Sequence, residues 1–147
     1  MGTIIPSYEM PEEAIEWSRR SIEFTVPGGK LNRGLTVVHT VQLIRHAEGA
    51  EASADELRRA AILGWCVEWL QAFFLVADDV MDSSISRRGK PCWYRLPGVG
   101  LIAVNDAFLL KSHIFLFLKR HFGTDPFYSQ LLDLFIEVRN GGRLISE

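Results

Sequence analysis

Cysteine is scarce in this sequence, and the spacing of the two cysteines matches no metal-binding or redox motif. Cys66 lies in an apolar helical run, and Cys92 stands between Pro91 and Trp93, with no Cys-x-x-Cys pair. Two distant cysteines favour free thiols in a reducing compartment over the alternatives of a zinc site or a disulfide. Metal-ligand spacing is also missing among the four histidines, His39, His46, His113 and His121.

An excess of positive charge is absent as well. The 16 Lys and Arg residues are opposed by 18 Asp and Glu residues, which gives a net charge of −2. Such a chain has no overall basic field to attract nucleic acid or an anionic membrane. Any anion-binding site must therefore be local.

The sequence also lacks an uninterrupted hydrophobic run long enough to suggest a membrane span. Glu68 and Gln71 interrupt the best candidate before it reaches about 18 to 20 apolar residues. The first residues contain no basic segment followed by an apolar core, and Pro6 stands where a myristoylation motif needs Ser or Thr. We therefore expect a cytoplasmic protein.

What the chain does have is hydrophobicity in helical spacing. Its composition, 48% hydrophobic and 23% charged, fits a single domain over residues 1–147. Strand signals are almost absent, and the periodicity predicts at least five helices, at 11–24, 31–47, 54–82, 101–122 and 126–138. The third is apolar nearly all round, so we predict an all-α fold packed around this one buried helix.

Local signals support two of the helix starts. Glu12 and Glu13 follow Pro11 in the first turn of the first helix, where negative charge suits the helix dipole. Ser53 and Glu56 form a capping box before the third. The buried side of the second helix stays open, because its apolar residues form two faces: Leu31, Leu35 and Val38, or Val37, Val41 and Ile44.

Three aspartates end the most apolar run, "FFLVADDVMD". If the helix continues to Asp82, then Asp78 and Asp82 share a face, and Asp79 is turned away by about 100°. Like charges at this spacing repel each other, and the C-terminal end of a helix also disfavours anions. Something positive should therefore lie beside them.

Carboxylates without histidine or thiolate neighbours are the ligands of Mg²⁺ or Mn²⁺. Because Mg²⁺ usually bridges one or two carboxylates to substrate phosphates, the pattern indicates a phosphorylated ligand. Arg87, Arg88 and Lys90 in the next loop could bind its other oxygens. The alternative of a solvated acidic helix end stays open.

A second basic cluster is "PGGKLNRG", residues 27–34. Its glycines let the backbone approach an anion, and Lys30 and Arg33 stand at the start of a predicted helix. A surface turn is the alternative. Gln71 is a polar side chain on the helix that we expect to be buried, so it needs a partner.

Three segments together resemble the N-terminal half of the short-chain trans-prenyltransferases, the family of the farnesyl diphosphate synthases: "GGKLNRGL", "LGWCVEWLQAFFLVADDVMDSSISRRGKPCWYR" and "NDAFLL". The resemblance runs from about Gly28 to Val138. It implies an all-α isoprenoid synthase bundle that works as a homodimer. The implied reaction joins isopentenyl diphosphate to dimethylallyl or geranyl diphosphate, with Mg²⁺, to form farnesyl diphosphate.

The resemblance also implies roles for single residues. The magnesium ligands would be Asp78, Asp79 and Asp82, and Arg87 would face the allylic diphosphate. Isopentenyl diphosphate would be bound by Gly29, Lys30, Arg33, Gln71 and Arg88. Product length would be limited by Phe73 and Phe74, which suggest fifteen carbons.

The sequence departs from this family near its end. The family's second aspartate-rich motif and later lysines are missing, and the tail at 139–147 diverges, as a truncated product or a gene-model error would. We expect such a chain to aggregate and to have little activity, because helices without neighbours expose apolar faces. The alternatives are a non-catalytic helical module that dimerises with or regulates a fuller enzyme, and a helical scaffold that binds no ligand with Mg²⁺.

Overall fold

The computed structural model describes residues 10–141 of the chain. Most of this part is helical, which confirms the predicted all-α class. The five α-helices are α1 (Glu12–Thr25), α2 (Asn32–Ala47), α3 (Ala54–Met81), α4 (Ile102–Phe122) and α5 (Tyr128–Gly141). The predictions for Pro6, for the first residues and for 142–147 of the tail fall outside the described residues.

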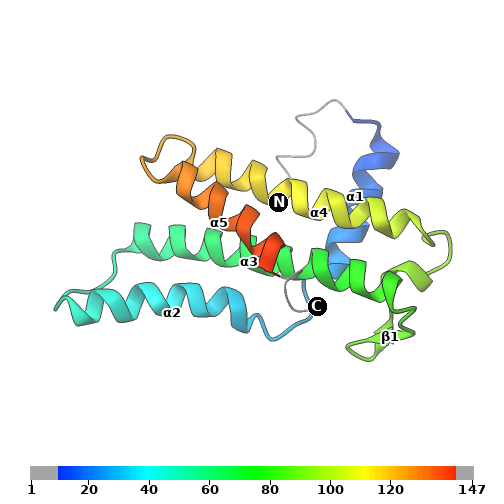
Figure 1. Ribbon diagram of the computed structural model, residues 1–147, viewed down its shortest axis with the longest axis horizontal. Helices are drawn as coiled ribbons and strands as arrows, with labels where there is room; N and C mark the ends of the chain where they lie inside the picture. The colour runs from blue at the N-terminus through cyan, green and yellow to red at the C-terminus, as the bar shows by residue number, and fades with distance from the viewer. Residues whose placement is uncertain (1–9, 142–147) are drawn as a thin grey trace.

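The sequence predicts a loop between α3 and α4, but this segment contains short elements. Strands β1 (Ser86–Arg87) and β2 (Lys90–Pro91) form a small antiparallel hairpin, and the 3₁₀ helix η2 (Trp93–Arg95) follows it. Figure 1 shows this hairpin beside the C-terminal end of α3. The hairpin thus stands where the aspartates end the helix.

The long helices lie side by side along the molecule. In Figure 1, α2 and α3 run antiparallel as neighbours, and α4 lies on the other side of α3. Helices α1 and α5 both contact α4. The core lies between α3, α4 and α1, where the largest fully buried side chains include Trp69, Leu110, Ile114, Leu118 and Phe122.

Helix α3 is less enclosed than its composition suggested. Nine of its residues are buried, among them Trp69, Leu70 and Val76, while Trp65 remains 43% exposed. Helix α3 is therefore the central helix that the sequence predicts, but it is only partly enclosed by the other described elements. Both cysteines are buried with free thiols, and burial raises the pKa of the Cys66 thiol to about 12.

The length and composition of α3 would allow it to cross a membrane, despite Glu68 and Gln71. The expectation that Glu68 and Gln71 leave the chain without a helix of membrane-spanning length and composition is therefore wrong. One helix of this kind is weak evidence for a membrane, since the core helix of a soluble protein has the same composition.

The side of α2 that faces α3 combines both predicted faces. Gly34 is buried, and Val37, Val38 and Val41 are half-buried. Leu35, Leu43 and Ile44 point outward, between 48% and 67% exposed. Much of the apolar surface of α2 is thus uncovered in the described part of the molecule.

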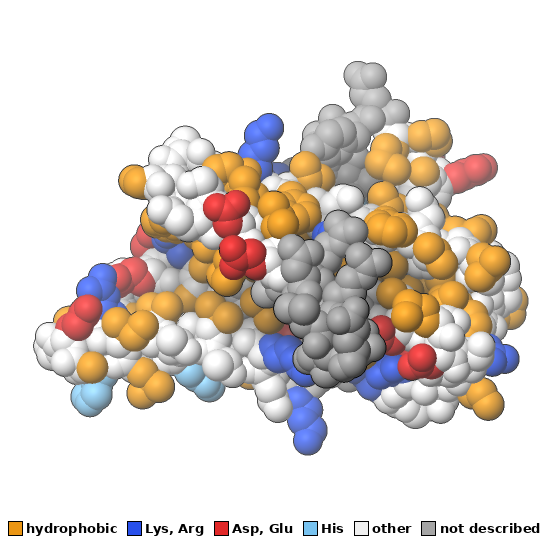
Figure 2. All heavy atoms as spheres, viewed as in Figure 1, with side chains coloured by type: hydrophobic (Ala, Val, Ile, Leu, Met, Phe, Trp, Pro, Cys, Tyr) orange, Lys and Arg blue, Asp and Glu red, His pale blue; other side chains and the backbone are white. Residues whose placement is uncertain are grey.

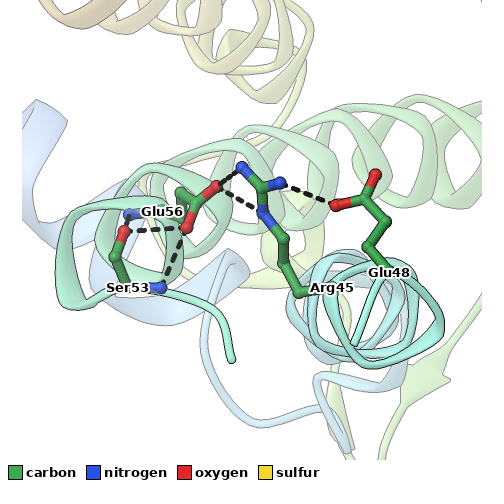
Figure 3. A network of polar contacts seen from close by, with 4 residues as sticks. All are labelled: Arg45, Glu48, Ser53 and Glu56. Carbon is green, nitrogen blue, oxygen red and sulfur yellow. Dashed lines mark hydrogen bonds and ion pairs between the residues drawn. The ribbon is translucent and has the colours of Figure 1, made fainter. Parts of the chain in front are cut away.

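One polar network joins the C-terminal end of α2 to the start of α3 (Figure 3). Arg45 donates from Nε to Glu56 Oε1 at 2.7 Å and from Nη1 to Glu48 Oε2 at 2.7 Å. Glu56 also completes the predicted capping box with Ser53. The Ser53 backbone N–H and the Arg45 guanidinium together hold the pKa of Glu56 at about 2. This network fixes one end of the α2–α3 pair.

Helix α5 differs from the prediction by more than one residue at each end, whereas the other helix ends agree to within one residue. Helix α5 starts at Tyr128 rather than at Pro126, because the Tyr128 N–H closes a turn on the Asp125 carbonyl at 3.1 Å. It continues to Gly141 rather than stopping at Val138, so three further residues keep the helical backbone.

Candidate functional site

The three aspartates lie together at the end of α3 but differ in burial. Asp78 and Asp82 are exposed and one turn apart, as the helical spacing predicts. Asp79 is 4% exposed and faces the hairpin. Helix α3 ends at Met81, and Asp82 caps it by donating its N–H to the Asp78 carbonyl at 2.8 Å.

Asp79 is held by Arg87. The Arg87 Nε lies 2.8 Å from Asp79 Oδ1 and 2.9 Å from Oδ2, and Nη2 lies 2.7 Å from Oδ1. Hydrogen bonding to Asp79 raises the pKa of Arg87. The neighbouring Cys92 thiol has a raised pKa, first because it is buried and then because of Asp79. The positive charge predicted beside the aspartates is thus present in Arg87, and it forms an ion pair with the buried Asp79.

The hairpin turn places Arg88 next to the first basic cluster. Arg88 and Gly89 occupy the two turn positions, with φ of 53° and 74°, and a non-glycine residue rarely adopts this left-handed conformation. The Arg88 Nη1 donates to the Pro27 carbonyl at 3.1 Å. A Cβ added to Gly29 would meet Arg88 Nη2 at 2.8 Å, so glycine allows this close approach. The two basic loops, 61 residues apart, therefore touch.

An open cavity of about 100 Å³ lies where these loops meet α3. Gly28, Arg87, Arg88 and Lys90 line it on the loop side, and Val76 lies on the α3 side. A cavity with three cationic side chains and a flexible glycine backbone is suited to an anion with several oxygens. Of the predicted site residues in the described part, Asp79, Arg87 and Arg88 line this cavity.

The other predicted residues do not line this cavity. Lys30 and Arg33 are exposed at the start of α2. The Gln71 Oε1 is buried on α3 and has no hydrogen-bond partner among the described residues, so the partner that we expected is not found there. Phe73 and Phe74 contact each other with ring centroids 5.0 Å apart.

The described residues contain no group of three or more His, Cys, Asp or Glu side chains placed to hold a metal ion. Asp78 and Asp82 nevertheless fit a partial magnesium site, because Mg²⁺ takes one or two carboxylates and fills its other positions with water and phosphate. Asp79 fits less well while Arg87 binds both of its oxygens.

Sequence reasoning missed two buried carboxylates near these loops. Asp106 on α4 is 1% exposed and accepts from the indole N–H groups of Trp17 at 2.9 Å and Trp93 at 2.7 Å. Glu68 on α3 is 7% exposed and accepts from the Gly34 backbone N–H at 2.7 Å. Each is an acidic residue within an apolar helix, and this feature of the sequence could have indicated a buried carboxylate that needs a hydrogen-bond partner.

Comparison with known proteins gives a consistent result. The polyprenyl synthetase family model matches residues 15–142. The farnesyl pyrophosphate synthase of Kluyveromyces lactis is 57% identical over 136 residues, covering 92% of this chain and 39% of the relative. That of Panax ginseng is 55% identical over 133 residues, covering 90% and 38%. The chain thus spans less than two fifths of the length of these curated relatives.

Solved structures agree with the sequence relatives. A T. brucei farnesyl diphosphate synthase in complex with the bisphosphonate BPH-721 aligns with a TM-score of 0.81 and 40% identity, covering 89% of this chain and 37% of that one. A further crystal structure of the T. brucei enzyme aligns with a TM-score of 0.79 and 41% identity, over 89% and 37%. The fold is therefore that of the all-α isoprenoid synthases, as the sequence predicted.

Proposed function

The chain belongs to the polyprenyl synthetase family, and from this premise we propose that it carries the diphosphate-binding part of a prenyltransferase. The proposed reaction joins isopentenyl diphosphate to dimethylallyl or geranyl diphosphate and forms farnesyl diphosphate. The observation that carries this proposal is the contact of Arg88 with Pro27, which brings two basic loops to one cavity beside the end of α3. The curated relatives are farnesyl pyrophosphate synthases, which supports this product.

Isopentenyl diphosphate would bind at the loops. Its proposed partners are Gly29, Lys30, Arg33, Gln71 and Arg88. The exposed Lys30 and Arg33, and an Arg88 that lies against Gly29, support this assignment. The Gln71 Oε1 has no partner in the described part of the chain, so a water that donates to it would satisfy this buried acceptor, while the Gln71 amide N–H groups would donate to the diphosphate.

The allylic diphosphate would bind at the end of α3. Asp78 and Asp82, with Asp79 as a further candidate, would hold Mg²⁺ or Mn²⁺, which would offset the charge of the departing diphosphate. Arg87 would add a fixed positive charge, and its pairing with Asp79 keeps the guanidinium oriented. Oriented charge of this kind favours loss of the diphosphate because it needs no rearrangement as the charge develops.

The apolar part of the substrate would lie along α3. The allylic cation must be kept from water, and apolar helix walls do this. Phe73 and Phe74 lie one turn before the aspartates, and Phe73 also contacts the ring of Phe108 at 6.4 Å between centroids. We propose that these two rings limit the product to fifteen carbons.

We further propose that the working enzyme is a cytoplasmic homodimer. A second candidate function is that of a non-catalytic module that binds or regulates a fuller enzyme. Large apolar side chains that are exposed in the described part favour either kind of association, among them Leu101, Phe108 and Leu134. Mixing the chain with a full-length family member separates the two, because a module forms a complex without adding turnover.

The direct test is product formation from isopentenyl and geranyl diphosphate with Mg²⁺. We expect farnesyl diphosphate at a low rate from the purified chain, and none from Asp78→Ala. Asp55→Ala is the matched control, since Asp55 is an exposed aspartate on the same helix, paired with Arg58. No product from a folded sample, or equal product from Asp78→Ala, contradicts catalysis at this site.

A further inference from the structure

Helix α2 begins without a cap of its own. Its N-cap residue is Leu31, which has a φ of 51° and offers no side-chain acceptor, and its first turn contains no acidic residue. The first backbone N–H groups of a helix need acceptors from elsewhere, and a helix without a cap is less stable. Lys30 and Arg33 stand at this uncapped start.

Glu68 supplies the missing acceptor from the neighbouring helix. Its Oε1 lies 2.7 Å from the Gly34 nitrogen, and Gly34 is the third residue of α2. The residue is 7% exposed, so the carboxylate is removed from bulk water. A negative group at a helix start also suits the positive end of the helix dipole.

Two glycines make this contact possible. A Cβ on Gly34 would lie 2.8 Å from the Gly64 carbonyl oxygen and 3.0 Å from Glu68 Cγ. A Cβ on Gly64 would lie 2.5 Å from the Gly34 carbonyl oxygen. The first turn of α2 thus packs closely against α3 where Gly34 meets Gly64, and there the Glu68 side chain reaches the backbone of α2.

We propose that Glu68 is a positioning residue of the diphosphate site. By capping α2 from α3, it fixes the backbone at Gly34 and therefore the direction in which Lys30 and Arg33 leave the helix start. This inference rests on the proposed function, since it needs a diphosphate at the basic loops. The acceptor oxygen matters here and not the charge, because a buried carboxylate would by itself repel the anion.

The test is titration of the chain with inorganic pyrophosphate by calorimetry, with three variants. Glu68→Ala removes the acceptor, and we expect affinity to fall about tenfold, since the buried Gly34 N–H is then left without an acceptor. Glu68→Gln keeps an acceptor oxygen, so affinity should stay within about twofold of that of the unchanged chain. Arg45→Gln breaks the network at the other end of the same helix pair (Figure 3), so it should lower the melting temperature and leave affinity unchanged.

Three results overturn the inference: full affinity in Glu68→Ala, affinity as low in Glu68→Gln as in Glu68→Ala, or an equal loss in Arg45→Gln. Amide hydrogen exchange adds a readout that needs no ligand. The Gly34 amide should be protected in the unchanged chain and exposed in Glu68→Ala, with residues 40–47 unaffected. An unchanged chain that binds no pyrophosphate contradicts the proposed function, whereas an unprotected Gly34 amide contradicts the positioning role.

Discussion

The ion pair between Asp79 and Arg87 allows a sharp prediction, because its two partners are buried to different extents. The Asp79 side chain is 6% exposed and the Arg87 side chain is 37% exposed. If Arg87 is replaced by Met, the buried carboxylate loses both of its donors. If Asp79 is replaced by Asn, the guanidinium can still turn toward water. The two single substitutions should therefore differ in cost.

The magnitudes follow from these exposures. Leaving a buried charge without its partner costs roughly 3 kcal/mol, so Arg87→Met should lower the melting temperature by roughly 10 °C in a chain of this size. Asp79→Asn should cost about 1 kcal/mol, in the range for a partly exposed pair. The double variant removes both charges and should be more stable than Arg87→Met alone.

Urea unfolding followed by tryptophan fluorescence measures these differences, since Trp93 lies beside the hairpin. Arg58→Met is the control. It breaks an exposed pair with Asp55 on the same helix and should cost less than about 0.5 kcal/mol. Equal costs for the two single variants, or a double variant less stable than Arg87→Met, would contradict the unequal burial of the two partners as the cause.

Four further predictions concern the stability and the self-association of the chain. The pKa of Glu56 is held at about 2, below its usual 4.5, so its contribution to stability is complete above about pH 4.5 and is lost toward pH 2. Unfolding curves at several pH values should therefore show the free energy of unfolding falling between pH 4.5 and pH 2, and Arg45→Gln should make this fall smaller. Gly64→Ala should destabilise by roughly 1 to 2 kcal/mol in urea unfolding, because the new Cβ meets the Gly34 carbonyl and a gain of helix propensity offsets only part of the overpacking. Asp106→Leu should lower the melting temperature, since two buried indole N–H groups lose their acceptor, and a full-stability variant would contradict that role. Hydrophobic side chains spread over much of the face shown in Figure 2, so light scattering should detect self-association at micromolar concentration.

The helices were predictable because their signals are local. Ser53 and Glu56 form a capping box within one turn, and the structure contains it. Glu12 and Glu13 mark the start of α1 in the same way. The i, i+4 relation of Asp78 and Asp82 follows from helix geometry alone. Such features need no knowledge of distant parts of the chain.

The pairings across the site were not predictable in this way. The sequence placed Arg87 near the aspartates but could not tell that Asp79 alone is buried against it. Glu68 could be recognised only as an interruption of an apolar run, because its partner Gly34 lies 34 residues away on another helix. Asp106 joins indoles from α1 and η2, and nothing local to α4 indicates either partner. Buried polar partners are decided by packing between helices, which a single sequence does not display.

We propose that this chain binds a prenyl diphosphate through its basic loops and, with Mg²⁺, through Asp78 and Asp82. Calorimetric titration with geranyl diphosphate, with Mg²⁺ and then with EDTA in its place, tests this binding. We predict binding that needs Mg²⁺ and is lost in Asp78→Ala but kept in Asp55→Ala. Binding of equal strength in EDTA, or no binding by a folded chain, would contradict it.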